Sequence, residues 1–165
     1  MKLKLVILFS VISAFFLINS CQKDDFQADN LFQASVNNES KSLSADNVSV
    51  KRGVSSIAGY LNDESTDGVL ILTIKGDKPG RYRQVYDYKT GVSITECGLN
   101  YKILSRKIPS DESNYYVSFE GEVIIDKIDF DSKLMSGSYS FKMRSIPDRQ
   151  KEQIISGKFI NVRFK

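Results

Sequence analysis

The C-terminal third of the chain alternates apolar and polar residues along three runs separated by turn-forming residues. The runs cover Tyr115 to Ile128, Leu134 to Met143 and Ile154 to Phe164, and the turns fall at Asp129 to Lys133 and Pro147 to Glu152. A period of two residues is typical of a β-strand with one buried face. Strands that follow one another through short turns form a meander. The sequence therefore predicts a three-strand meander at the C-terminus.

Shorter runs of the same kind fill the chain from Val48 onward. They are rich in β-branched and aromatic residues and cover Val48–Leu61, Val69–Ile74, Arg81–Tyr88 and Leu99–Leu104. No segment after the leader has a convincing 3.6-residue period, which an amphipathic helix requires. The chain is therefore predicted to be all-β, either an antiparallel β-sandwich or a small up-and-down β-barrel.

Before Val48 the pattern is weaker. Phe32 to Val36 reads as the first strand, Asn37-Asn38 as a turn, and the polar residues 37 to 47 as a loop. Further along, Gly121, Gly137 and Gly157 interrupt strand patterns, which indicates bulges or tight bends.

The first 20 residues read as a secretory leader. Lys2 and Lys4 form a basic start, and Leu5 to Ile18 is an apolar stretch of 14 residues. A membrane-spanning helix needs roughly 20 apolar residues, so cleavage is favoured over anchoring by a helix. We expect residues 1–20 to be a signal peptide, residues 21–31 a tether and residues 32–165 a single β domain.

Leu17-Ile18-Asn19-Ser20-Cys21 resembles a bacterial lipobox. The resemblance implies that Cys21 carries lipid and that cleavage leaves it as the first residue. Two or more acyl chains give stable membrane anchoring, because each buried CH₂ contributes about 0.8 kcal/mol. The alternative is a secretory signal with an incidental cysteine.

Lys23-Asp24-Asp25 follows the cysteine directly and resembles the export signal of Bacteroidota lipoproteins. The resemblance implies an outer-membrane protein that faces the cell exterior. The alternatives are a plain charged tether and a protein held on the periplasmic leaflet.

Charge and composition exclude several classes of function. Two of the 23 Lys and Arg residues lie in the leader, so the mature part carries 21 against 20 Asp and Glu. A nearly neutral chain without a basic run is not expected to bind nucleic acid. The chain has no histidine, which excludes Ser-His-Asp and Cys-His catalysis and histidine metal ligands. We expect no catalytic residues, no metal and no cofactor.

Two acidic patterns are weak candidates for chemistry. Asp63 to Gly68 copies the first half of a calcium loop, but Ile74 stands where a bidentate carboxylate is required. Glu120 and Glu122 lie about 6.5 Å apart on one face of a strand, and a carboxylate pair could serve a glycosidase. The opposite face is the apolar one, so the interpretation favoured is that both carboxylates face solvent.

Tyrosines mark the only candidate ligand site. Tyr82, Tyr86 and Tyr88 alternate along one strand face, and exposed tyrosines pack against sugars or protein partners. The alternative is that this face lines the core. Cys97 has no partner if Cys21 carries lipid, and it is either a buried apolar residue or a reactive thiol.

Five short motifs recur at strands and turns: Phe32-x-Ala34-x-Val36-Asn37, Gly80-x-Tyr82, Phe119-Glu120-Gly121, Ser136-Gly137-x-Tyr139-x-Phe141 and Ile155-x-Gly157-x-Phe159. Together they resemble a group of small Bacteroidota lipoproteins with a single β-rich domain of unknown function. The resemblance spans residues 31 to 165 and implies a fold and a cellular location, not an activity.

Together these features predict a non-enzymatic, lipid-anchored outer-membrane lipoprotein that binds a glycan or a protein. One alternative is a structural or accessory subunit of an envelope complex, and a more distant one is a carboxylate-based hydrolase. The membrane itself, through the lipid on Cys21, is the first expected partner.

Overall fold

The computed structural model describes residues 30–62, 67–87, 89–104 and 115–165, and within these ranges the chain forms ten β-strands and no helix. None of these described segments is therefore a helix able to cross a membrane. The strands are β1 (Leu31–Val36), β2 (Glu39–Lys51), β3 (Val54–Asn62), β4 (Asp67–Ile74), β5 (Gly80–Asp87), β6 (Val92–Thr95), β7 (Cys97–Leu104), β8 (Tyr115–Asp129), β9 (Leu134–Ser145) and β10 (Glu152–Arg163).

Eight of these strands close into an antiparallel barrel. Around the barrel the order is β8-β7-β4-β3-β2-β1-β10-β9, and β9 pairs again with β8. The predicted all-β class is confirmed, closure selects the barrel over the open sandwich, and the predicted C-terminal meander is β8-β9-β10. A closed sheet leaves no exposed edge along the barrel wall.

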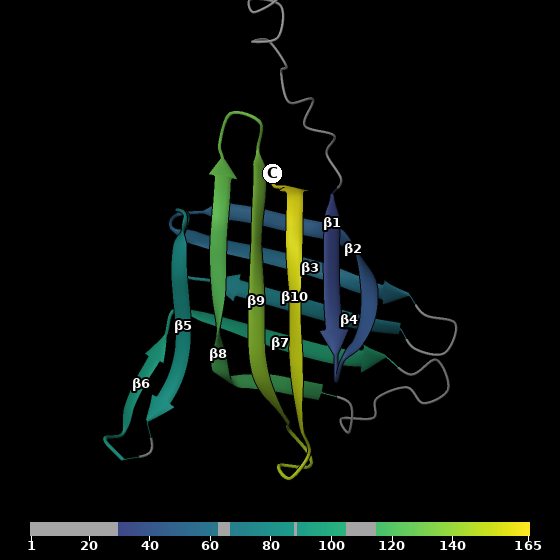
Figure 1. Ribbon diagram of the computed structural model, residues 1–165, viewed down its shortest axis with the longest axis vertical. Helices are drawn as coiled ribbons and strands as arrows, with labels where there is room; N and C mark the ends of the chain where they lie inside the picture. The colour runs from purple at the N-terminus through teal and green to yellow at the C-terminus, as the bar shows by residue number, and fades with distance from the viewer. Residues whose placement is uncertain (1–29, 63–66, 88, 105–114) are drawn as a thin grey trace, which may run out of the picture.

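Figure 1 shows that the barrel is flattened into two layers. β8, β9, β10 and β1 run side by side in the layer nearest the viewer, while β2, β3, β4 and β7 cross behind them. We call these the front and back layers. β8 begins beside β7 and then bends upward into the front layer, so one long strand belongs to both.

The interpretation of residues 37–47 as a loop is wrong. Asn37 and Asn38 do form the expected turn, with φ of 50° and 71°, but β2 begins at Glu39. Leu43 is buried in the core, whereas the serines on either side of it point outward. Serine has low hydropathy, so this outward row hid the strand pattern.

Aromatic side chains dominate the front half of the core. Phe32, Phe141 and Phe159 are fully buried, and Tyr139 is 4% exposed. Three cross-strand pairs place a ring opposite a glycine: Phe141 with Gly121, Phe159 with Gly137, and Tyr139 with Gly157. An added Cβ at each glycine would collide with that ring. These glycines make room for neighbouring rings, a role related to the bends that the sequence suggested.

A bulge changes which face of β8 is buried. The register with β9 shifts between Ser118 and Glu120, so Val117 lies opposite Arg144 while Gly121 lies opposite the buried Phe141. Cross-strand partners share a face. Val117 therefore points outward with Arg144, and the single buried face predicted for the run from Tyr115 to Ile128 is wrong before the bulge.

β5 and β6 form a hairpin outside the closed barrel. β5 pairs with the upper part of β8, from Gly121 to Ile125, above the short stretch where β7 pairs with β8. The sequence did not predict β6. Between the two pairings, Gln84 Nε2 donates to Ser118 O at 3.1 Å and Ser118 Oγ accepts from Leu99 N at 2.8 Å. The side chain of Gln84 thus joins the hairpin to β8, and the side chain of Ser118 joins β8 to β7, where backbone pairing stops.

Candidate functional site

Most residues chosen from the sequence lie outside the described structure. These are the lipidation site Cys21, the export residues Lys23, Asp24 and Asp25, and Tyr88. The backbone of Tyr86 belongs to β5, but its side chain is also outside the described part. For these residues the sequence-based hypotheses stay predictions.

Tyr82 is placed, and it packs inward against the edge of the core. Its ring covers Gly76, and its hydroxyl donates to Lys78 O at 2.8 Å. A ring and a hydroxyl that are both engaged within the protein have a structural role. Tyr82 is therefore not a candidate ligand-binding residue.

Cys97 is buried, with 3% of its surface exposed. Its thiol lies 3.3 Å from Tyr82 O. Burial raises the pKa of this thiol from 9.0 to about 12, and the nearby carboxylates of Glu96 and Glu122 add to the effect. Because the thiolate is the nucleophile, the buried, protonated Cys97 acts as a small apolar core residue.

A shallow trough lies on the outer side of the front layer. It consists of three adjoining hollows of about 410, 90 and 420 Å³. Glu122 and Ser140 line both the first and second hollows, and Ser138 lines both the second and third. We call these hollows together the outer trough. It runs across β5, β8, β9, β10, β1 and β2.

Strand register explains why the trough is lined with hydroxyl groups. One cross-strand row reads Arg83, Glu122, Ser140, Ser156, Ser35, Ser40. The next row reads Arg81, Ile124, Ser138, Lys158, Gln33, Ser42. Small serines in the middle, flanked by longer side chains, leave a shallow depression. The rows therefore create a hydroxyl-rich floor with charges at the side of β5 and at Lys158.

Ion pairs hold most of the charges at the β5 side of the trough. Lys142 Nζ lies 3.0 Å from Glu120 Oε2, and Arg81 Nη1 lies 3.4 Å from Glu122 Oε2. Glu120 and Glu122 thus both point outward, as expected, and each faces a cation. Arg83 contributes its backbone N–H to Glu96 at 3.0 Å. Its guanidinium has no ion pair with any residue that the structure describes.

Gln84 adds an unsatisfied polar atom beside the same charges. Its Nε2 is bonded to Ser118, but its Oε1 is buried and has no hydrogen-bond partner among the described residues. Gln84 lines the first hollow of the trough. A buried acceptor without a donor has a free-energy cost of about 1–3 kcal/mol. Gln84 pairs with Gly121, which lies opposite the buried Phe141, so this acceptor faces inward beneath the trough.

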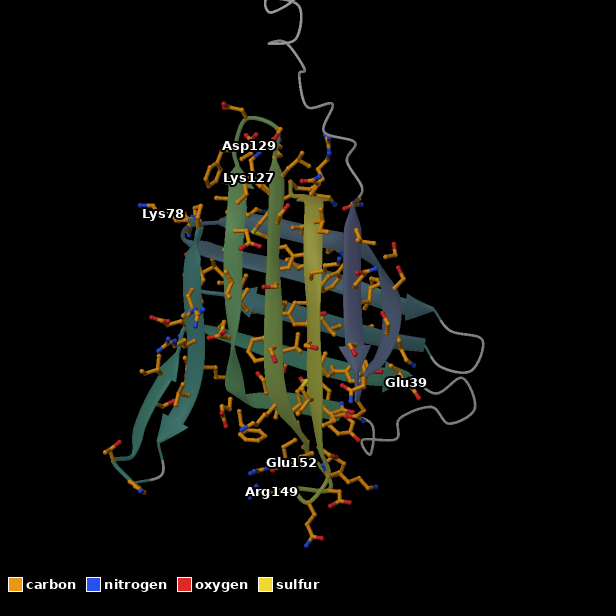
Figure 2. All side chains as sticks on the ribbon, viewed as in Figure 1. Glu39, Lys78, Lys127, Asp129, Arg149 and Glu152 are labelled. Carbon is orange, nitrogen blue, oxygen red and sulfur yellow. The ribbon has the colours of Figure 1, made fainter. Side chains whose placement is uncertain are left out.

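Figure 2 shows where other charged residues gather. Lys127 and Asp129 lie at the β8–β9 turn, whereas Arg149 and Glu152 lie at the β9–β10 turn at the opposite end. At the first turn, Asp129 Oδ1 accepts hydrogen bonds from Asp131 N at 2.9 Å and Ser132 N at 3.0 Å. Hydrogen bonds from Ser132 lower the pKa of this carboxyl. These residues cap the strand ends and lie away from the trough.

The outer side of the back layer differs from the trough in chemistry. One of its cross-strand rows is Tyr60, Val69, Lys102, Tyr115, and the next is Ala58, Ile71, Asn100, Val117. Tyr60 and Ile71 are 37% and 39% exposed. We call these two rows the apolar back face.

Within the described ranges, no three Cys, Asp or Glu side chains are grouped so that they could hold a metal ion. The half calcium loop at Asp63 to Gly68 falls largely outside those ranges, because residues 63–66 are not described.

The outer trough was missed by the sequence analysis, although one signal for it was present. Serines recur at every second position in Ser40-x-Ser42-x-Ser44 and in Ser136-x-Ser138-x-Ser140. Period-two serine opposite buried residues indicates a strand with a small, polar outer face. The comparisons with known proteins add no further assignment: no protein family, no curated protein and no solved structure matches this chain.

Proposed function

We propose that this chain is a non-enzymatic lipoprotein of the outer membrane, anchored through lipid on Cys21, that binds a glycan or a protein. The leader, the lipobox-like junction and Lys23-Asp24-Asp25 support the anchor and an orientation toward the cell exterior. A short tether to Leu31, where β1 begins, would keep the barrel near the membrane and free to meet partners.

The observation that carries the binding proposal is the outer trough. The apolar core fills the barrel interior with large side chains such as Phe32, Phe141 and Phe159, as is usual for eight strands. The trough instead offers a broad, shallow surface in which serines and charged side chains lie beside the exposed Val85 and Ile154. Such a mixed surface suits recognition of an extended ligand.

The same geometry argues against the hydrolase alternative. Hydrolysis by two carboxylates needs one that stays protonated and a substrate held between the pair. Glu120 and Glu122 instead lie side by side on an open strand face, each paired with its own cation. We therefore assign them to binding rather than to catalysis.

The anchor is tested by replacing Cys21. We expect Cys21→Ala to leave the membrane fraction and to keep its leader, because neither lipid addition nor the following cleavage would occur. The matched control is Cys97→Ala, which should stay with the membrane. A Cys21→Ala protein that remained membrane-bound and processed would contradict the lipid anchor.

Exposure on the cell surface is tested by protease treatment of intact cells that carry an epitope tag after Lys165. The expected result is loss of the tag while a periplasmic control protein stays intact. Protection of the tag would rule out the external orientation and favour the periplasmic leaflet.

The apolar back face is the observation that favours the alternative, an accessory subunit of an envelope complex. Exposed apolar rows are common where proteins associate. If this alternative holds, Ile71→Ser should abolish crosslinking to a neighbouring envelope protein without changing the fold. If crosslinks persist in Ile71→Ser, the back face is not the contact surface.

A further inference from the structure

We propose that the outer trough binds an acidic glycan, with Arg83 and Lys158 holding its anionic groups and the serine rows holding its hydroxyls. This inference rests on the proposed binding function and specifies the ligand class. It commits to a polysaccharide that carries carboxylate or sulfate groups.

The first step is the charge that remains after internal pairing. Arg81 and Lys142 are paired with Glu122 and Glu120. Arg83 and Lys158 are both exposed, and neither side chain makes an ion pair within the described part of the chain. The carboxylate of Glu96 accepts a hydrogen bond from the backbone N–H of Arg83. It lowers the local positive potential but does not pair with the guanidinium. Two cations are thus available to an anionic ligand.

The second step is the distance between these cations. Arg83 shares a row with Ser156, and Lys158 is two residues further along β10. Three strand spacings and one two-residue step separate their Cα atoms by about 16 Å. A single small anion cannot contact both. A polymer with repeated anionic groups can contact both, and binding at two linked points raises the effective affinity.

The third step distinguishes a glycan from other polyanions. Between the two cations the floor offers Ser140, Ser156 and the carboxylate of Glu122. Hydroxyls and carboxylates accept hydrogen bonds from sugar hydroxyls.

The fourth step excludes an extended peptide bound as an added strand. That mode needs free backbone N–H and C=O groups at a sheet edge. β8, β9, β10 and β1 each have a hydrogen-bonded neighbour on both sides. The trough crosses the face of these strands, so recognition must come from side chains. A ligand rich in hydroxyl groups fits that requirement.

The test uses the detergent-solubilised full chain, immobilised through a tag after Lys165, with interferometry as the readout. The probes are polygalacturonate for carboxylate, chondroitin sulfate for sulfate, dextran as a neutral polysaccharide and polyglutamate as an acidic peptide. We expect at least one acidic polysaccharide to bind at least tenfold more tightly than dextran and polyglutamate. Comparing the affinities for polygalacturonate and chondroitin sulfate shows whether carboxylate or sulfate is preferred.

Variants then locate the binding. Arg83→Gln combined with Lys158→Gln should weaken acidic polysaccharide binding at least tenfold, whereas Lys102→Gln on the apolar back face should not. Ser156→Leu should block the floor, and Ser56→Leu on the back layer is its matched control. Circular dichroism of each variant distinguishes loss of ligand binding from loss of the folded structure.

Three results would overturn the inference. They are no binding of either acidic polysaccharide, equally tight binding of polyglutamate, and an equal loss in Lys102→Gln and the double variant. Tight binding of dextran that Ser156→Leu abolishes would overturn the acidic-glycan inference and leave the proposed function standing. The protease test on intact cells judges the surface location independently of all these outcomes.

Discussion

The two outer faces of the barrel share one core and differ in the outward-pointing side chains at their centres. Across the front layer, the central outward residues are serines bordered by ion pairs. Across the back layer, the corresponding positions hold Ala58, Tyr60, Val69 and Ile71. Closing a barrel requires only that inward side chains pack. The difference between the faces is therefore not needed for folding and points to separate uses.

The faces also differ in how the core supports them. Beneath the outer trough, rings of Tyr139, Phe141 and Phe159 lie opposite glycines. Behind the apolar back face, the core is mainly aliphatic, with Leu70, Leu72 and Ile74 fully buried and Tyr101 as its buried ring. Aromatic rings packed on bare backbone leave little tolerance for added atoms. The floor of the trough should be the more rigid of the two surfaces.

The largest effect that tests this difference is expected from one added methyl group. In Gly157→Ala, the new Cβ would collide with Gln33 O and lie 2.6 Å from the Tyr139 hydroxyl. We expect a loss of about 1–3 kcal/mol in the free energy of unfolding, the usual range for overpacking. Urea denaturation gives this value directly.

The matched substitution on the back layer is Gly98→Ala. Its Cβ would meet only Ser118 Oγ, at an ordinary 3.7 Å, so we expect a change within about 0.5 kcal/mol. Equal losses in the two variants would mean that the front layer is no more tightly packed than the back layer.

A smaller effect is expected from removing a hydroxyl beneath the trough. Tyr139 OH donates to Gln33 O at 3.0 Å, and Tyr139→Phe should cost about 1 kcal/mol. Tyr60→Phe on the apolar back face removes a hydroxyl from an exposed ring and should change little. If Tyr139→Phe were as stable as the unaltered protein, the bond to β1 would contribute nothing.

The same residue affects stability at alkaline pH. Burial raises the pKa of Tyr139 above 10.0 and that of Cys97 from 9.0 to about 12. The unfolded chain therefore releases these protons at a lower pH than the folded chain, and stability falls as pH rises from about 9. We expect Tyr139→Phe and Cys97→Val each to reduce this fall, as measured by melting temperature between pH 8 and 11. A pH-independent melting temperature over that range would contradict it.

The alternation of apolar and polar residues, with turn residues between the runs, was enough to predict most strands, the all-β class and the C-terminal meander. Asn37-Asn38 and the alternation in β9 are short-range signals, and both were interpreted correctly. The bulge after Ser118 was not predictable in this way, because it depends on the pairing of β8 with β9. Barrel closure through β1 and β10 joins the two ends of the domain and leaves no local trace.

The candidate site could not be predicted from the sequence for the same reason. Its serine row joins Ser35, Ser40, Ser140 and Ser156, which come from four strands and meet only through register. The tyrosines were prominent in sequence, yet Tyr82 packs inward. Residue type suggested a tyrosine site confined to β5, whereas the trough extends from β5 across the meander to β1 and β2.

The smallest expected effect concerns the ion pair between Glu120 and Lys142. Both side chains are about half exposed, at 49% and 52%, and such pairs typically contribute about 0.2–1 kcal/mol. A double-mutant cycle with Glu120→Gln and Lys142→Gln should give a coupling near the lower end, and 0.5 M salt should remove it because exposed charges are screened. The control cycle pairs Glu120 with Lys102 on the apolar back face and should show no coupling. A larger coupling that survives salt would mean that the charged side of the trough is shielded from water, and a ligand would then have to displace Lys142 before reaching Glu120.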